Sequence, residues 1–359
     1  MSDLLVKVLE VTDVRLHPNA ERLEIVSAGG WEIVSGKGNY KTGDLVVHIP
    51  PDAMVPRPLA EQWSVAQYLS FSNSSPDKGR VKAAKLRGFV SYGFFAPNDS
   101  NAPVGSDLRE HYGIEKYEPP IPVGMQAGQM ARNHPLFHTY TDIQNIRNYP
   151  DQLIYGEPLV VTEKIHGTNS RVGWIRGDNG LEIAIGTHRT QRKPEDCGVY
   201  GLPFDLYRDG LEAACKRIFD DMQCPKVGDG FPVNSLILFG EIFGPGVQDL
   251  TYGKEKAWRV FDIAVNGIYL PWNYVEDICA TYGLPIVPHV IGVFTFEQLC
   301  TLAEGESVLS PGQIKEGLVV RPTYEQTWGR GTMDPQPKRR IFKVISGSYL
   351  TRKGGTEYH

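Results

Sequence analysis

The first hundred residues of this 359-residue chain consist of short segments in which apolar and polar residues alternate. Gly, Pro and Asp separate these segments, which read LLVKVLEVTDVRL, RLEIVSAGGWEIVSGKGNY, DLVVHIP and RGFVSYGFFAP. A period of two residues is typical of strands that bury one face. Because the segments are short and closely spaced, they predict a small, closed or partly open β-barrel.

A proline-rich stretch follows this β-rich half and stiffens the chain at Pro119, Pro120 and Pro122. A chain of this length is expected to form about two domains. Beyond the prolines, apolar residues recur every three or four positions in two helix-like segments, 209–222 and 273–283. Strand-like segments are expected at 159–164, 171–175, 181–186, 235–240, 258–265, 317–321 and 341–345. We predict an α+β protein with a barrel domain at 1–120, a linker at 121–135 and, at 136–359, a domain of antiparallel sheets with flanking helices.

Composition narrows the classes of protein. Hydrophobic residues make up 41% and charged residues 22%, which is ordinary for a globular chain and argues against disorder. The net charge of −5 gives no overall attraction to nucleic acid, so a surface that binds nucleic acid must be a local basic cluster. One such cluster, equally readable as a solvated face, comprises Arg80, Lys82, Lys85 and Arg87.

Cysteines and hydropathy indicate the compartment. The five cysteines are odd in number and contain no C-x-x-C pair, a pattern that fits reduced thiols. No run of about 20 apolar residues is present that would span a bilayer. We therefore expect a cytoplasmic protein without a membrane partner.

Two other patterns are weaker candidates for sites. The segment GKGNYKTGD has two glycines, Gly38 and Gly43, at the spacing of a phosphate loop, but Asp44 stands where the lysine is required. A turn between strands is the better interpretation. His134 and His138 could share a helix face as metal ligands, but Pro135 follows the first of them and a third ligand is not evident.

The segment EKIHGTN places Lys164 three residues after the end of the apolar run 159–161. By itself it could be an outward-facing strand lysine followed by a tight turn. The alternative is a nucleophile, because a neutral amine attacks electrophilic phosphorus and forms a covalent intermediate. An ordinary lysine is almost wholly protonated at pH 7, so nearby cations or a bound metal would have to lower its pKa.

EKIHGTN resembles the lysine motif, Lys-x-His/Asp-Gly, of the covalent nucleotidyltransferases, and its wording is closest to RNA ligases. Further segments are similar to the other motifs of that family and occur in the family's order: GTHR, LFGEIFG, VFDI, EGLVVR and IFKVIS. They supply, in turn, Arg189, Glu241, Phe261, Glu316 with Arg321, and Lys343.

The resemblance implies a role for each of these residues. Lys164 would carry AMP from ATP, assisted by Glu241, Glu316, Lys343 and His166. Glu241 and Glu316 have oxygen donors suited to Mg²⁺ or Mn²⁺. Residues implied to contact the nucleotide are Glu163, Ile165, Asn169, Arg189, Phe261 and Arg321. For Phe261, packing in the core alone remains an alternative.

The last motif departs from the family pattern. The family usually has two basic residues one position apart, whereas this chain has Ile341, Phe342 and Lys343. Lys343 would act alone or with Arg339 or Arg340.

The N-terminal half is similar to the OB-fold modules of tRNA-binding domains, which bind single strands through aromatic and basic positions. An OB domain placed before the transferase motifs resembles the RNA ligase type 5 family. The resemblance implies a monomeric ATP-dependent RNA ligase that seals nicks between a 3′-hydroxyl and a 5′-phosphate through lysyl-AMP, with RNA on the 3′-hydroxyl side of a duplex. The alternatives are a GTP-dependent capping-type transferase and a non-enzymatic RNA-binding protein with a decayed transferase domain.

Overall fold

The computed structural model describes residues 3–73, 75–118, 129–178, 180–221, 232–329 and 337–354. The chain forms two compact units. Unit 1 comprises Met1–Glu118, Ile143–Ile154 and Lys343–Gly354, and unit 2 comprises Pro119–Asp142, Tyr155–Phe342 and Gly355–His359. The units therefore differ from two consecutive domains, because two later segments return to unit 1. The composition of these two segments, Ile143–Ile154 and Lys343–Gly354, does not distinguish them from unit 2. Residues 121–128 of the predicted linker lie outside the described residues.

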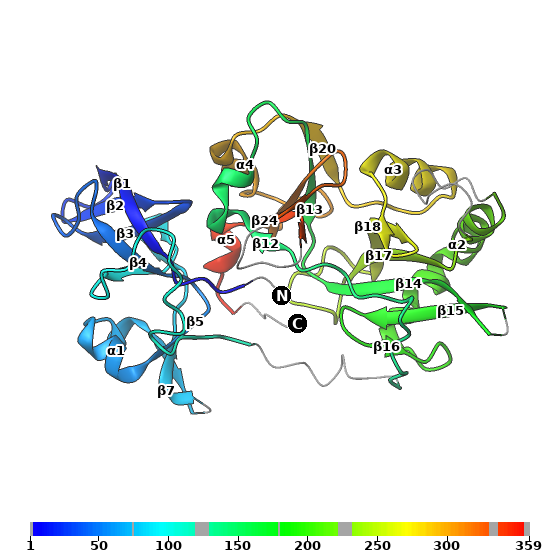
Figure 1. Ribbon diagram of the computed structural model, residues 1–359, viewed down its shortest axis with the longest axis horizontal. Helices are drawn as coiled ribbons and strands as arrows, with labels where there is room; N and C mark the ends of the chain where they lie inside the picture. The colour runs from blue at the N-terminus through cyan, green and yellow to red at the C-terminus, as the bar shows by residue number, and fades with distance from the viewer. Residues whose placement is uncertain are drawn as a thin grey trace. The chain divides into compact units, whose positions relative to one another are not determined.

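Unit 1 is built from short antiparallel strands (blue and cyan in Figure 1). One sheet has the order β10-β4-β1-β2-β3 and another the order β11-β5-β7-β6. The first contains β1 (Val8–Leu16), β2 (Leu23–Ala28), β3 (Trp31–Gly36), β4 (Leu45–Ile49) and β10 (Phe94–Pro97). The second contains β5 (Ala53–Pro56), β6 (Ser70–Ser72), β7 (Ser75–Arg80) and β11 (Glu115–Lys116).

The remaining elements of unit 1 are short. They are the hairpin β8 (Ala84–Leu86) and β9 (Phe89–Ser91), the strands β12 (Gln144–Asn145) and β24 (Phe342–Ile345), the helices α1 (Arg57–Gln62) and α5 (Gly347–Leu350), and the 3-10 turns η1 (Ala66–Tyr68), η3 (Ile146–Asn148) and η4 (Pro150–Gln152). Gly38 and Gly43 both have positive φ and lie between β3 and β4, as expected for a turn.

The alternation seen in the sequence fills the cores of unit 1. In β1 the side chains of Val8 and Val11 are wholly buried, and a break in register between Val11 and Asp13 shifts the alternation. One apolar cluster is centred on Val8, Val47, Ile49 and Val55, and a second contains Val26 and Ile33. Strands that bury one face in this way stabilise a small β-rich unit.

Unit 2 contains a six-stranded antiparallel sheet in the order β16-β15-β14-β17-β18-β19 (green to yellow in Figure 1). Its strands are β14 (Thr168–Gly177), β15 (Gly180–Thr187), β16 (Gln191–Arg192), β17 (Ser235–Phe243), β18 (Ala257–Val265) and β19 (Ile268–Tyr269). In a further antiparallel group, β13 (Leu159–Lys164) pairs with β20 (His289–Gly292) on one side and with β21 (Gly317–Pro322) on the other.

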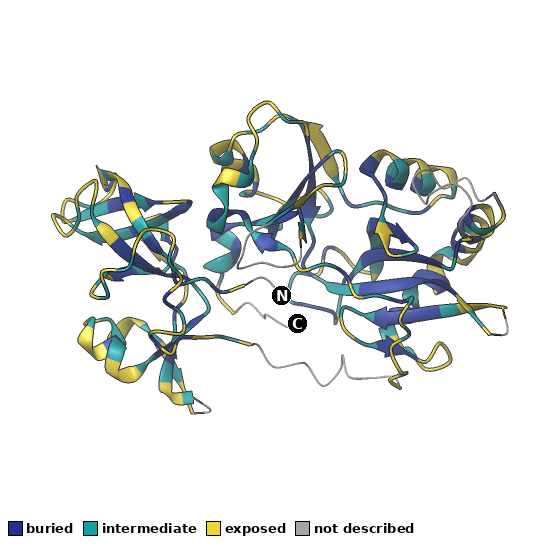
Figure 2. Cartoon of the chain, in the orientation of Figure 1, coloured by how far each residue is buried: buried dark blue, intermediate teal, exposed yellow. Residues whose placement is uncertain are grey.

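The helices of unit 2 are α2 (Leu202–Asp221), α3 (Trp272–Thr281) and α4 (Phe296–Leu302). Its other elements are the 3-10 turn η5 (Gly198–Gly201) and a pair of short strands, β22 (Thr327–Trp328) and β23 (Lys338–Arg339). Residues of α2 and α3 join the strands in one core that includes Leu211, Trp258 and Trp272. The central strand β17 is almost entirely buried, and its neighbour β14 is buried along its middle (Figure 2).

The predicted α+β class is confirmed, and each of the seven expected strands and both expected helices overlaps an observed element. Cys197, Cys215, Cys279 and Cys300 are free thiols, while Cys224 lies outside the described residues. None of the helices in the described part of the chain is long and apolar enough to cross a membrane.

Candidate functional site

Two strand registers bring the predicted catalytic residues of unit 2 together. Lys164 is the last residue of β13 and is paired with Gly317 of β21, so Glu316, the residue just before that strand, lies close to it. Residues 165–167 connect β13 to β14, where Asn169 is paired with Glu241 of β17. The lysine, both glutamates and the asparagine therefore gather where β13 gives way to β14.

Gly167 allows this close approach. A Cβ atom at this position would lie 2.2 Å from the carbonyl oxygen of Ile242 and 3.0 Å from Cγ of Glu241. The first distance is too short for any side chain because it involves the backbone, and the second is a tight contact, so only glycine lets the loop pass against β17. The glycine of EKIHGTN is thus required by the path of the chain beside Glu241.

An ion pair joins Lys164 to Glu316, with 2.5 Å between Nζ and Oε1. Burial by itself would lower the pKa of Lys164, but the carboxylates of Glu316 and Glu241 raise it above its ordinary value. The sequence led us to expect nearby cations that lower this pKa. The protein's own charged groups beside the amine are instead carboxylates, which raise it. Lys164 is a protonated, resting amine until the charge of those carboxylates is neutralised.

The two glutamates differ in their affinity for protons. Burial raises the pKa of Glu241 to about 8, and the charge of Glu316 adds to this effect. For Glu316, burial acts in the same direction, but Lys164 and His166 hold the pKa at about 2. One carboxyl thus keeps its charge at neutral pH, while the other readily accepts a proton when no cation is near.

The side-chain oxygen atoms of Glu241, Glu316 and Asn169 are suitable ligands for a divalent cation that binds few protein groups. Oδ1 of Asn169 is buried without a hydrogen-bond partner, and the carboxylates of Glu241 and Glu316 both act on Lys164. No group of three or more His, Cys, Asp or Glu residues in the described ranges could hold a metal ion. Mg²⁺ commonly binds through one or two carboxylates and keeps several waters, so two glutamates are a sufficient set. The candidate pair His134 and His138 forms no such group either.

His166 lies between two carboxylates. Its Nε2 is 2.7 Å from Oδ1 of Asp249 and its Nδ1 is 3.6 Å from Oε2 of Glu316. The backbone amide of His166 donates a hydrogen bond of 2.8 Å to the hydroxyl of Tyr252. The sequence analysis did not identify Asp249 or Tyr252, although both lie in the Gly-rich segment that directly follows the Glu241 motif.

The residues that flank Lys164 are held by the protein itself. Glu163 accepts hydrogen bonds from the hydroxyl of Ser307 at 2.5 Å and from the backbone amide of Val308 at 2.9 Å. Ile165 is buried in the main core of unit 2. Both positions fix the strand end that carries Lys164.

The other residues expected to contact nucleotide lie in different surroundings. Arg189 is exposed in the loop that follows β15. Phe261 is half-buried on β18, packs against the core and has its ring 5.0 Å from that of Tyr140. Arg321 is buried on β21 and donates a hydrogen bond of 2.8 Å to Asp262.

Arg321 belongs to a buried ion network that the sequence analysis did not identify. Asp262 is fully buried and also accepts hydrogen bonds from Arg339 at 2.5 Å and from the Tyr140 hydroxyl at 2.8 Å. Glu325 is the second partner of Arg339. Arg340 is paired with Glu157 at 2.7 Å. Both arginines considered as partners of Lys343 therefore neutralise carboxylates of unit 2.

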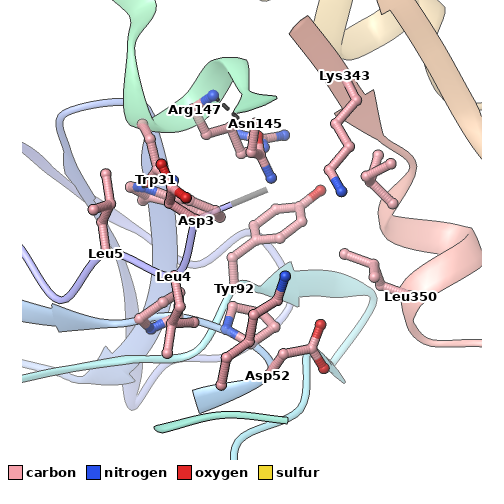
Figure 3. Close-up of a pocket in the computed structure, with 15 residues that line it drawn as sticks. Asp3, Leu4, Leu5, Trp31, Asp52, Tyr92, Asn145, Arg147, Lys343 and Leu350 are labelled. Carbon is pink, nitrogen blue, oxygen red and sulfur yellow. Dashed lines mark hydrogen bonds between the residues drawn. The ribbon is translucent and has the colours of Figure 1, made fainter. Parts of the chain in front are cut away.

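Lys343 belongs to unit 1, where it begins the returning segment 343–354. It lines a cavity of about 110 Å³ together with Trp31, Tyr92 and Arg147. Figure 3 shows its side chain entering this cavity from β24 on the side of Tyr92. The guanidinium of Arg147 lies 4.3 Å from the centre of the Tyr92 ring and donates to the carbonyl of Gly30.

In the basic cluster of unit 1, Arg80 forms contacts within the protein and the other three cations are exposed. Arg80 binds Asp52 at 2.6 Å and stacks on Tyr117, with 3.7 Å from its guanidinium carbon to the ring centre. Lys82, Lys85 and Arg87 are exposed on the surface of unit 1.

Two family models match the chain. An RNA ligase family model matches residues 157–345, more than half of the chain, and an OB-fold domain model matches residues 5–98. The prediction of an N-terminal OB fold is thus confirmed. A search of curated protein sequences gives no match.

Solved structures of an RNA ligase from Naegleria gruberi share the fold. The ligase with pyrophosphate is 24% identical, with a TM-score of 0.73 over 97% of this chain and 98% of that chain. A mutant with ATP and manganese is 24% identical, with a TM-score of 0.73 over 96% of this chain and 98% of that chain. A second mutant with the same ligands is 23% identical, with a TM-score of 0.75 over 97% and 98% of the two chains.

Proposed function

Because the chain belongs to the RNA ligase family, we propose that it is an ATP-dependent ligase that joins a 3′-hydroxyl to a 5′-phosphate through lysyl-AMP. The observation that carries this proposal is the position of Lys164 at a rigid strand end, paired with Glu316 and influenced by Glu241. ATP is the nucleotide present in related structures of the Naegleria gruberi enzyme. A lysine held against two carboxylates suits an amine that is activated only when cation and nucleotide arrive.

The first step forms one bond and breaks another. Nζ of Lys164 loses its proton and attacks the α-phosphorus of ATP, and the bond from that phosphorus to the leaving pyrophosphate oxygen breaks. The AMP then passes from Lys164 to the 5′-phosphate of the nucleic acid. Attack by the 3′-hydroxyl on the activated phosphate releases AMP and completes the phosphodiester bond.

The chain's own residues prepare the amine for this chemistry. Glu241 and Glu316 would hold Mg²⁺ or Mn²⁺, and Asn169 offers an unused oxygen beside them. When bound, the cation supplies positive charge next to the phosphates and the carboxylates. Once the glutamate charges are balanced, burial is the remaining influence on Lys164 and lowers its pKa toward the neutral, nucleophilic form.

We further propose the substrate and the roles of the remaining predicted residues. Arg189, Phe261 and Lys343 contact the nucleotide or its phosphates, and Arg321 supports the nucleotide pocket through Asp262. The exposed cations of unit 1 bind the backbone of a nicked duplex whose 3′-hydroxyl strand is RNA. We also propose that the enzyme acts as a monomer.

The decisive experiment mixes the protein with Mg²⁺ and ATP labelled at the α-phosphate. We expect the label on denatured protein, its loss in Lys164→Ala, and its retention in Lys216→Ala, which removes an exposed lysine of α2. Label that persists without Lys164 would refute the lysyl-AMP mechanism. Labelling by GTP in place of ATP would favour the capping-type alternative, and a wholly unlabelled chain would favour a non-enzymatic RNA-binding protein.

A substrate series tests the second part of the proposal. Nicked duplexes carrying either RNA or DNA on the 3′-hydroxyl side are compared for sealing by the same preparation. We expect the RNA strand to be sealed faster, and equal rates on both would refute the proposed strand preference.

A further inference from the structure

The loop between β17 and β18, residues 244–256, forms hydrogen bonds with the segment that follows Lys164. Three of its side chains contact two consecutive residues beyond Lys164. The amide of Gln248 donates a hydrogen bond of 3.1 Å to the carbonyl of Gly167. Asp249 binds the ring of His166, and the hydroxyl of Tyr252 accepts from its backbone amide. The loop therefore fixes both the backbone and the side chain of the residue two positions after the lysine.

Asp249 also sets the orientation of an imidazole that faces a second carboxylate. The side chain of His166 is 6% exposed, that of Glu316 is 11% exposed and that of Asp249 is 21% exposed. The hydrogen bond between Nε2 and Asp249 fixes the plane of the ring, so that Nδ1 faces Oε2 of Glu316 at 3.6 Å. The imidazole is thus held between Asp249 and Glu316, the carboxylate that is paired with Lys164.

We propose that Asp249 is a positioning residue for lysine adenylylation, acting through His166 to hold Glu316 against Lys164. This inference rests on the proposed function. Asp249, His166, Glu316 and Lys164 form a continuous series of contacts, with 2.7, 3.6 and 2.5 Å between successive side chains. A carboxylate at position 166 would be repelled on both sides, because it would face both Asp249 and Glu316.

Removal of the charge of Asp249 tests whether this residue acts on lysine adenylylation. In the full-length protein, Asp249→Asn keeps the shape of the side chain but removes its charge. We expect the rate of lysine labelling at saturating ATP to fall about 10- to 100-fold, the usual effect of removing a group that orients a ligand of the site. Glu255→Gln, an exposed carboxylate of the same loop, is the matched control and should label at the normal rate.

The second pair of variants asks whether Asp249 acts through His166. His166→Asp alone places a third carboxylate beside Asp249 and Glu316 and should label slowly. His166→Asp combined with Asp249→Asn removes the repulsion, and we expect at least a threefold faster rate than in His166→Asp. If Asp249→Asn by itself does not fold, this comparison carries the test, because removing adjacent like charges favours folding.

Two further measurements separate positioning from a merely structural role. Binding of α,β-methylene ATP should be within twofold of the unmodified protein in Asp249→Asn, and its thermal midpoint should be nearly unchanged. Asp249→Glu, which retains the charge, should recover part of the lost rate.

A normal rate in Asp249→Asn, or a double variant no faster than His166→Asp, overturns the inference while leaving the proposed function intact. An unmodified chain that is not labelled overturns the proposed function.

Discussion

The buried ion network around Asp262 should contribute a large share of the stability of unit 2. One carboxylate oxygen of Asp262 accepts hydrogen bonds from Arg321, Arg339 and Tyr140. Asp262→Asn keeps an oxygen that can accept some of these bonds but removes the charge between two buried guanidinium groups. Glu325 still faces both arginines, so the variant leaves two cations with one close anion.

The magnitude follows from the cost of unpairing a buried charge. Removal of one partner of a buried ion pair typically costs ~3–5 kcal/mol. Because Glu325 still balances part of the charge, we expect about 3 kcal/mol for Asp262→Asn. With a urea dependence of ~2–3 kcal/mol per molar, the midpoint of unfolding should fall by about 1 M or more.

The assay is urea unfolding followed by tryptophan fluorescence, with Trp258 and Trp272 as buried reporters in unit 2. Asp209→Asn, which changes an exposed aspartate of α2, is the control and should stay within about 0.5 kcal/mol. A loss below about 1 kcal/mol in Asp262→Asn would refute the view that the network stabilises the unit through charge.

The same variant has a pH signature. Burial by itself would raise the pKa of Asp262, but Arg321 and Arg339 hold it below its ordinary value. A depressed carboxyl pKa contributes stability that is present above the ordinary value and is lost as the pH falls through the folded value. The stability difference between the unmodified protein and Asp262→Asn should therefore shrink below about pH 4. A difference that stays constant down to acid unfolding would contradict the assignment.

Two further predictions concern the glutamates and the basic surface. Burial raises the pKa of Glu241 to about 8, so its contribution to stability declines as the pH rises from its ordinary value, near 4.5, through 8. In metal-free thermal unfolding, Glu241→Gln should flatten this decline and should also reduce the stabilisation by Mg²⁺, whereas an unchanged Mg²⁺ effect would count against Glu241 as a ligand. Replacement of Lys82, Lys85 and Arg87 by serine should weaken binding to nicked duplex and lower its salt dependence while lysine labelling is preserved, and an unchanged salt dependence would place the nucleic-acid surface elsewhere.

The local elements were predictable from the sequence because they depend on short-range patterns. Alternation and helical spacing identified the strands and helices of both units, and the ordered motifs identified Lys164, Glu241 and Glu316. Their meeting follows from antiparallel register, which places Glu316 next to the lysine and Asn169 next to Glu241. These three expected residues therefore converge within unit 2, whereas Lys343 belongs to unit 1.

Long-range partners were less predictable. Arg321 follows an apolar run, and the sequence does not indicate that Asp262 lies opposite it in space. Asp249 lies in a Gly-rich loop, and its contact with His166, 83 residues away in the sequence, appears only in the folded protein. The signal for it was the density of polar residues in the segment after the Glu241 motif. Such residues are typical of loops that hold functional groups on a rigid scaffold.

The resting ion pair of Lys164 also bears on how long the enzyme remains usable. A protonated amine reacts poorly with acylating and carbamylating metabolites, because its lone pair is occupied by the proton. Glu316, which keeps its charge at neutral pH, holds the amine in that form in the absence of nucleotide. This carboxylate, proposed to bind a cation, therefore also protects Lys164 against accidental chemical modification.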